Sequence, residues 1–179
     1  TIISSANKKA LFVGDSTGGL KQISLRRTKN GEILIRDYGQ LHTAKILSLC
    51  IDSKDRYLYT CSEDGYVKKI NLLERNHVEI DKMWQAQKIE SIMINLYWTK
   101  EIKAPISLNT MLLSHSDSFL YIGTQEKLLL TINTDTFEVK QSNIFFKNIT
   151  CISERTDNFS IFAGTEKGSV YEIYAGSLL

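Results

Sequence analysis

The chain has 179 residues, of which 42% are hydrophobic and 23% charged, and its formal net charge is +2. This composition is typical of a globular protein and excludes wholesale disorder, which requires low hydrophobicity and high net charge. A nucleic-acid binder usually carries a strongly basic face, so the near-neutral charge argues against that class. No apolar run approaches the roughly 20 residues of a membrane-spanning helix, and membrane insertion is not expected.

The N-terminus has no basic segment followed by an apolar run, so no signal peptide is expected. The chain begins with Thr1 instead of Met, which indicates trimming or a fragment of a longer protein. Its three cysteines include no Cys-x-x-Cys pair, which favours a reducing, cytoplasmic environment, with cytoskeletal association left open. Cys50 and Cys151 lie in apolar segments, and burial is expected for both.

A two-strand pattern recurs four times, at residues 10–23, 55–71, 117–133 and 160–173. Each copy has a β-branched and aromatic run, a small residue, a polar turn that usually contains Gly, and a second strand that ends near an Ile. Two strands joined by such a turn predict a β-hairpin. The pattern therefore predicts a repeated all-β structure.

Further alternating segments flank these hairpins, so that each unit has four strands in roughly 40 residues, the size of a β-propeller blade. The predicted fold is all-β, with about four blades of four antiparallel strands in an incomplete ring. The predicted blades cover residues 1–37, 42–82, 85–141 and 148–174, the last being incomplete.

The third blade is longer than the others, and two registers fit it. Trp84–Ile94 matches Leu41–Ile51, which makes it the first strand and leaves an insertion at 97–107 before the second strand. The alternative uses Leu108–Leu113 as the first strand. The first register is preferred because it keeps a Lys-Ile-x-Ser pattern, and it accounts for Lys82–Leu96 better than a helix does.

These hairpins resemble the second and third blade strands of the WD-repeat family of β-propellers, although the Trp-Asp dipeptide of that family is replaced by Ile followed by Ser, Asn or Tyr. In the family, a His, a turn Asp, a strand hydroxyl and the Trp form a hydrogen-bonded network within a blade. The resemblance implies a structural pair between His42 and Asp64, with Thr60 or Ser62 as the hydroxyl. The other blades are expected to rely on apolar packing, with Ile in the Trp position.

Motifs for catalysis are missing from the sequence, which has no Gly-x-Ser-x-Gly, His-Glu-x-x-His or phosphate loop. The Gly-rich segment Gly14–Gly19 precedes an alternating strand, which indicates a hairpin turn; a phosphate site would need a helix there. The histidines have no metal-ligand spacing to the cysteines. No enzymatic activity, metal or cofactor is therefore expected.

The expected function is that of a protein-interaction scaffold in a larger WD-repeat protein or multiprotein assembly, because repeat arrays present broad rigid surfaces with specificity in their loops. Roughly seven blades are common in the family, so the remaining blades are expected from the same longer polypeptide or from a partner chain. Two alternatives stay open: recognition of a charged or modified peptide at the channel mouth, and a propeller-based enzyme.

Two opposite faces are candidate partner surfaces. The first carries the loops from a fourth strand to the next first strand, which are rich in the aromatic and Met residues found in interface cores: Tyr38, Gln40, His42, Met83, Trp84, Phe145 and Phe146. The second combines Tyr97 and Trp98 of the insertion, as anchors, with Arg26 and Arg27, which would steer an acidic partner. The alternative for Trp84, Phe146 and Trp98 is packing within or between blades. The basic pairs Arg26-Arg27 and Lys68-Lys69 are expected to be solvated.

Overall fold

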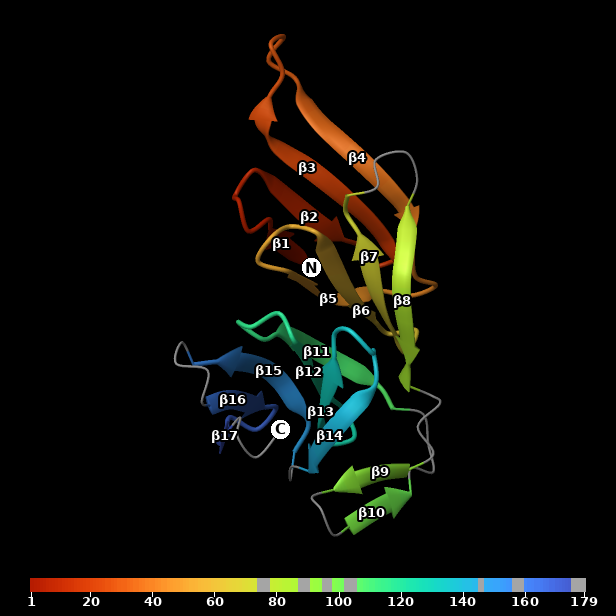
Figure 1. Cartoon of the computed structure of the whole chain (residues 1–179), viewed down its shortest axis with the longest axis vertical. Coiled ribbons are helices and arrows are strands. Elements are labelled where there is room, and N and C mark those ends of the chain that lie inside the picture. Colours follow the sequence, from red (N-terminus) through yellow and green to blue (C-terminus); the bar gives the residue numbers. More distant parts are fainter. Residues whose placement is uncertain are drawn as a thin grey trace. The chain divides into compact units, whose positions relative to one another are not determined.

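The computed structural model describes residues 1–73, 78–86, 91–94, 98–101, 106–144, 147–155 and 160–174. The strands in these residues form four sheets (Figure 1). Residue contacts divide the chain into two compact units, Thr1–Met83 and Trp84–Leu179. Within the described ranges, no helix has the length and apolar character needed to cross a membrane.

The first unit is built on two four-stranded sheets. One sheet contains, in spatial order, β1 (Ile2–Ser4), β2 (Ala10–Gly14), β3 (Gly19–Arg27) and β4 (Ile33–Gln40). The other contains β5 (Ile46–Ile51), β6 (Tyr57–Ser62), β7 (Tyr66–Asn71) and β8 (Glu79–Gln85). β3 and β4 are the longest strands of their sheet and form an extended hairpin, drawn in red-brown and orange in Figure 1.

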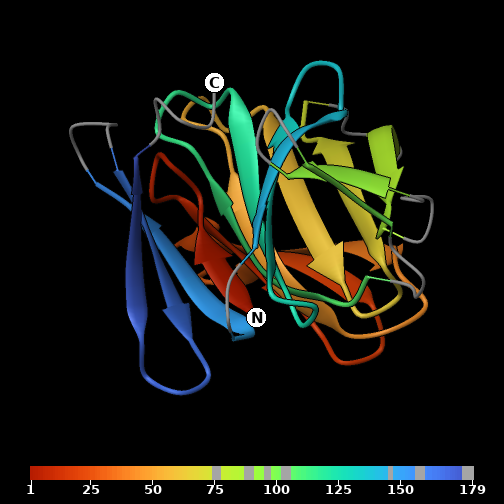
Figure 2. The same ribbon diagram turned by 90° about the horizontal axis from the view of Figure 1, so that it is seen from below.

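The second unit also contains two sheets. One has β11 (Leu108–Leu113), β12 (Phe119–Thr124), β13 (Leu128–Asn133) and β14 (Val139–Ile144), and it is extended beyond β14 by β9 (Ser91–Ile94) and β10 (Trp98–Glu101). The other has β15 (Ile149–Glu154), β16 (Ser160–Thr165) and β17 (Val170–Tyr174), which are the blue strands of Figure 2. The predicted fold class is confirmed: the described part of the chain is all-β, in four sheets whose blade strands pair antiparallel.

The preferred register of the third blade is wrong. β11 pairs with β12 from Leu108 to Leu113, so the alternative first strand is the correct one. The additional residues precede this blade, and β9 joins its outer strand through a parallel pairing of Ile94 with Ser142. The predicted insertion at 97–107 therefore does not separate a first from a second strand. The Lys-Ile-x-Ser match was misleading because it extends over few residues, whereas β11, β12 and β13 keep the spacing of β5, β6 and β7 throughout.

The first strand of three sheets carries a β-bulge at an equivalent position, between Ile46 and Ser48, Leu108 and Thr110, and Ile149 and Cys151. A bulge adds one residue to the strand and shifts the alternation of its side chains. Ile149 and Ile152 consequently both contact the core of the second unit. Cys151 is exposed. The expectation that it is buried was wrong because simple alternation ignored the bulge.

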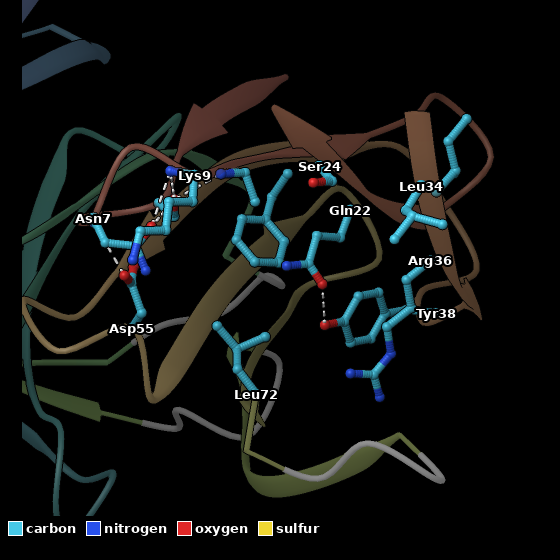
Figure 3. Close-up of a pocket in the computed structure, with 13 residues that line it drawn as sticks. Asn7, Lys9, Gln22, Ser24, Leu34, Arg36, Tyr38, Asp55 and Leu72 are labelled. Carbon is cyan, nitrogen blue, oxygen red and sulfur yellow. Dashed lines mark hydrogen bonds between the residues drawn. The ribbon is translucent and has the colours of Figure 1, made fainter. Parts of the chain in front are cut away.

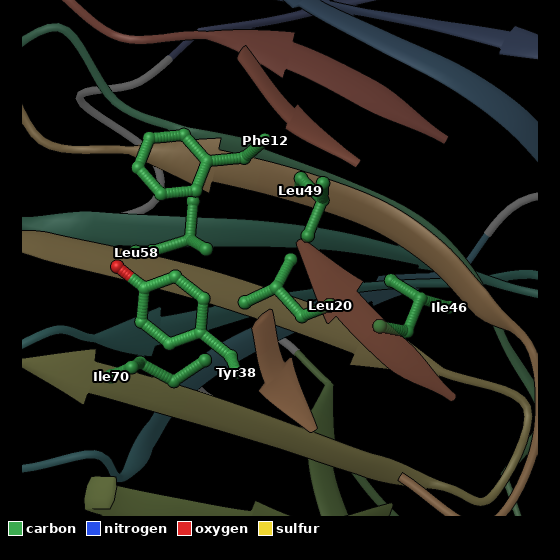
Figure 4. Packing of buried hydrophobic residues seen from close by; sticks show 7 residues of the cluster. All are labelled: Phe12, Leu20, Tyr38, Ile46, Leu49, Leu58 and Ile70. Carbon is green, nitrogen blue, oxygen red and sulfur yellow. The ribbon is translucent and has the colours of Figure 1, made fainter. Parts of the chain in front are cut away.

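The core of each unit is shared by its two sheets. In the first unit, seven buried residues come from both sheets (Figure 4): Phe12, Leu20 and Tyr38 from one, and Ile46, Leu49, Leu58 and Ile70 from the other. In the second unit, Tyr121 and Leu129 meet Ile149, Ile161 and Ala163. Complete burial of a side chain of this size stabilises a fold by about 1.5–3 kcal/mol, so each sheet depends on its neighbour.

The small residue of the repeated hairpin makes room for the first strand of the next sheet. A Cβ atom added to Gly14 would lie 2.8 Å from Cγ2 of Ile46, and one added to Gly123 would lie 2.6 Å from Cγ2 of Ile149. Both isoleucines have an exposed fraction of 0%. Packing between sheets therefore requires the small residue at these positions.

The turns between second and third strands are also equivalent in the four sheets. Gly18, Gly65 and Gly168 have positive φ angles, and the third sheet places Lys127 there with a φ of 66°. The left-handed conformation costs a residue with a Cβ atom about 1–2 kcal/mol. The third hairpin is therefore strained at the one turn where the repeat lacks Gly.

Lys127→Gly should raise the free energy of unfolding by about 0.5–1 kcal/mol. The strain that glycine relieves in the folded state outweighs the conformational entropy that it adds to the unfolded chain. Lys127→Ala is the matched control, since it removes the charged side chain and keeps the Cβ atom. Denaturant titration of the three proteins measures the difference. Equal stability of the Gly and Ala variants would contradict the explanation.

Candidate protein-interaction surface

The ring of His42 is buried in the first unit and has a partner at each nitrogen. Nδ1 lies 2.9 Å from Oδ2 of Asp64, and Nε2 lies 2.7 Å from Oγ1 of Thr60. The Asp64 carboxylate also accepts the backbone N–H groups of Thr43 and Tyr66, at 3.0 Å each. The structure thus brings together the two residues that the resemblance paired, with Thr60 as the hydroxyl. This network holds the segment before β5 on the turn between β6 and β7.

Burial and hydrogen bonding set the protonation states of His42 and Asp64. Burial lowers the pKa of His42, against the opposing effect of Asp64. Burial alone would raise the pKa of Asp64, but the N–H groups of Tyr66 and Thr43, together with His42, bring it below its usual value. Near neutral pH the arrangement is therefore a neutral imidazole that donates from Nδ1 to a carboxylate and accepts the Thr60 hydroxyl at Nε2.

Carboxylates also connect neighbouring sheets within each unit. Asp55, in the turn after β5, accepts the N–H groups of Ala6 and Asn7 from the turn after β1, at 2.6 and 3.0 Å. In the second unit, Glu154 of β15 accepts the N–H of His115 from the turn after β11, at 2.6 Å. These carboxylates lie at related places in the two units and stabilise turns.

Other polar groups of chemical interest are held in similar structural contacts. Lys69, expected to be solvated, is buried instead; its Nζ lies 3.3 Å from Oδ2 of Asp81 and 4.1 Å from the centre of the Tyr57 ring. Burial raises the pKa of the Cys61 thiol, which disfavours the reactive thiolate. Within the part of the chain that the structure describes, no three His, Cys, Asp or Glu side chains are grouped to hold a metal ion.

The far end of the β3–β4 hairpin exposes a row of large apolar side chains. Ile33, Leu34 and Ile35 of β4 have exposed fractions of 53%, 60% and 62%, and Leu25 of β3 has 52%. Consecutive side chains of a strand point to opposite faces, so both faces of β4 are apolar here. In the described sheet order, β4 is the last strand beside β3, and its other edge has no partner strand.

A groove of about 450 Å³ follows one face of this sheet (Figure 3). β4 contributes Leu34, Ile35, Arg36 and Tyr38 to its lining, and Leu72 and Asp55 approach from the second sheet. The Tyr38 hydroxyl donates to Oε1 of Gln22 at 3.1 Å. The Arg36 guanidinium lies over the Tyr38 ring, 4.6 Å from its centre. The groove is therefore partly apolar and partly polar, and it begins beside the exposed row of β4.

Positive charge surrounds this surface. The hairpin from β3 to β4 contains five cationic residues and two acidic ones: Lys21, Arg26, Arg27, Lys29 and Arg36, with Glu32 and Asp37. Lys21 and Asp37 lie 3.8 Å apart as an exposed pair, so most of the remaining charge at the end of the hairpin is cationic. An apolar strand with a basic border is thus the distinctive surface of the first unit.

The first predicted surface needs correction at two positions, because Tyr38 and His42 have exposed fractions of only 5% and 2%. Gln40 is exposed, and its amide donates to the backbone carbonyl of Thr17 at 3.0 Å. Met83 is exposed and Trp84 is half-buried, in β8. Phe145 and Phe146 lie outside the described residues.

The second predicted surface stays a prediction, because its basic and aromatic residues belong to different units. Arg26 and Arg27 are exposed at the end of β3, but the reason for placing them on the same rim as the insertion disappears with the corrected register. Tyr97 lies outside the described residues, and Trp98 is placed only as the first residue of β10.

The exposed row in β4 was missed by the sequence reasoning. The sequence does contain a sign of it, because Ile33–Ile35 is a run of three apolar residues. In a strand with one solvated face, apolar and polar residues should alternate.

The chain matches no protein-family model, and a search of curated proteins finds no significant match.

Stability of the first unit should decrease as the pH falls from about 7 to about 5. The ordinary pKa of His is about 6.5, and folding lowers that of His42, so in this window the unfolded chain binds a proton that the folded chain excludes. The stabilisation is complete above about pH 6.5 and is lost as the pH falls towards the folded pKa.

Denaturant unfolding at the two pH values, for the wild type and for His42→Gln, measures this effect. The wild type should lose more free energy of unfolding than the variant. An equal loss in both proteins would show that His42 is not responsible.

Proposed function

We propose that this chain is a protein-interaction scaffold of the WD-repeat kind, in which the blades hold the β3–β4 hairpin as a docking element for another protein. The observation that carries the proposal is the exposed row Ile33–Ile35, beside Leu25, on a hairpin whose other end is fixed in the core. Contiguous exposed apolar residues bordered by polar ones are typical of protein-binding sites.

The two ends of the hairpin have different roles in this proposal. Leu20 and Tyr38, at the near end, belong to the core shared by the two sheets. Leu25 and Ile33–Ile35, at the far end, face solvent. Because the near end is anchored, the far end presents its side chains in a fixed geometry, which lowers the entropic cost of binding. Arg26 and Arg27 border the apolar row, and Arg is among the residues enriched at interfaces.

The polar contacts favour binding over catalysis. His42, Asp64 and Thr60 hold a turn together, and Asp55 and Glu154 accept backbone N–H groups. The acid and base groups of these residues are thus engaged in structural hydrogen bonds. The three free cysteines support a reducing compartment such as the cytoplasm as part of the proposal, and a multi-subunit assembly is the expected setting.

The double substitution Arg26→Glu and Arg27→Glu should reduce the amount of co-purifying partner at least fivefold, because it reverses the charge that borders the apolar row. The measurement is quantitative affinity purification from an extract of the cells that make the protein. Lys45→Glu with Lys54→Glu is the matched control, since both lysines are exposed in the same unit. The proposal would be abandoned if the wild type retained no partner, or if both double variants retained as much as the wild type.

A further inference from the structure

We propose that the partner docks by adding a β-strand to the unpaired edge of β4, and that this strand alternates acidic and apolar residues. The inference rests on the proposed function and specifies how the partner binds. β4 ends the sheet order β1-β2-β3-β4 among the described strands. An edge strand offers a row of backbone N–H and C=O groups to another chain.

The arrangement of the exposed side chains favours a strand over a helix. Leu34, Ile35 and Arg36 of β4 line the groove, whereas Ile33 is exposed and is not among the lining residues. Consecutive side chains of a strand point to opposite faces, so a helix laid on one face would leave either Ile33 or Leu34 uncovered. A strand added in the plane of the sheet places side chains beside both residues, because its own residues also alternate between the faces.

The usual protections of an edge strand are missing at this point. The edge strands of natural sheets usually carry Lys, another charged residue or Pro, which prevents them from pairing with a strand of another chain. Ile33–Ile35 contains none of these over three consecutive residues, and the nearest charges are Glu32 before the row and Arg36 after it. The outer strand β8 of the neighbouring sheet differs, because charges flank Ile80 on both sides, at Glu79 and Asp81. Of the two outer strands β4 and β8, β4 is therefore the one with fewer barriers to strand addition.

Charge decides the chemistry of the occupant. Arg26, Arg27 and Lys29 lie at the end of the hairpin, against Glu32. Acidic side chains in the added strand would complement this charge, and its apolar side chains would cover the exposed row. A second copy of the chain is disfavoured, since pairing two β4 edges would bring two cationic hairpins together.

The groove gives the added strand a second point of contact. Leu34 lines the groove together with Leu72, which comes from the segment after β7. A volume of about 450 Å³ is sufficient to receive side chains of the partner. Side chains of the added strand on the Leu34 face would therefore meet a partly apolar surface instead of open water.

The test uses the whole chain and a fluorescein-labelled, end-blocked peptide of ten residues that alternates Glu and Val. The peptide should bind in fluorescence anisotropy, and a Lys–Val peptide of the same length should bind at least tenfold more weakly. Saturation with the Glu–Val peptide should slow amide hydrogen exchange in residues 33–37, because edge N–H groups become hydrogen-bonded. Unchanged exchange in these residues would overturn strand addition, and equal binding of the two peptides would overturn the acidic partner.

Two substitutions at similarly exposed apolar positions make a matched pair. Leu34→Glu should weaken peptide binding at least tenfold, and Ile80→Glu, on β8, should leave it within twofold; equal effects would overturn the assignment to β4. The exchange measurement on the wild type decides the question even if a variant fails to fold.

A concentration-dependent dimer that Leu34→Glu abolishes would instead identify a second copy as the occupant. A partner that co-purifies through the hairpin without slowing exchange in β4 would preserve the scaffold function and overturn strand addition alone.

Discussion

The packing of one sheet's first strand against the small residue of the preceding hairpin is the constraint on which the other features depend. Ile46 occupies the space above Gly14, and Ile149 occupies the space above Gly123. A bulge after each isoleucine then turns the residue three positions later, Leu49 or Ile152, towards the same core. The close approach of the sheets also brings their turns within hydrogen-bonding distance, as at Gly18, whose carbonyl accepts the N–H of His42.

This arrangement explains why several polar contacts of the described residues are buried or partly buried. When one sheet packs closely on the next, the turns at its ends become partly buried, and their backbone N–H groups require partners. In the first unit, Asp64 accepts the partly buried N–H of Tyr66, and Asp52 accepts that of Tyr57. The β3–β4 hairpin extends beyond this packed region, and its apolar end is left exposed. The surface proposed to bind a partner is thus the part of the β1–β4 sheet that the neighbouring sheet, β5–β8, does not cover.

Much of the fold could be predicted because the repeat is encoded locally. The four hairpins, the small residue and the turn that contains Asp64 all leave a pattern in the sequence. The first strand of the third blade was misplaced because a short match at Trp84–Ile94 competed with Leu108–Leu113, and only the pairing with β12 decides between them. Burial was harder to predict than strand position. The bulge reversed the expectation for Cys151, and the exposure of Ile33–Ile35 depends on how far the neighbouring sheet extends, which no local pattern records.

Native-state hydrogen exchange of Ile149→Ala tests most directly whether neighbouring sheets depend on one another. Removing this fully buried side chain should destabilise the second unit by about 2–5 kcal/mol. Because Ile149 shares its core with Tyr121 and Leu129 of the preceding sheet, we predict that protection falls in β12 and β13 as much as in β15 and β16, whereas Ile35→Ala changes neither. Loss of protection confined to β15, β16 and β17 would contradict the account.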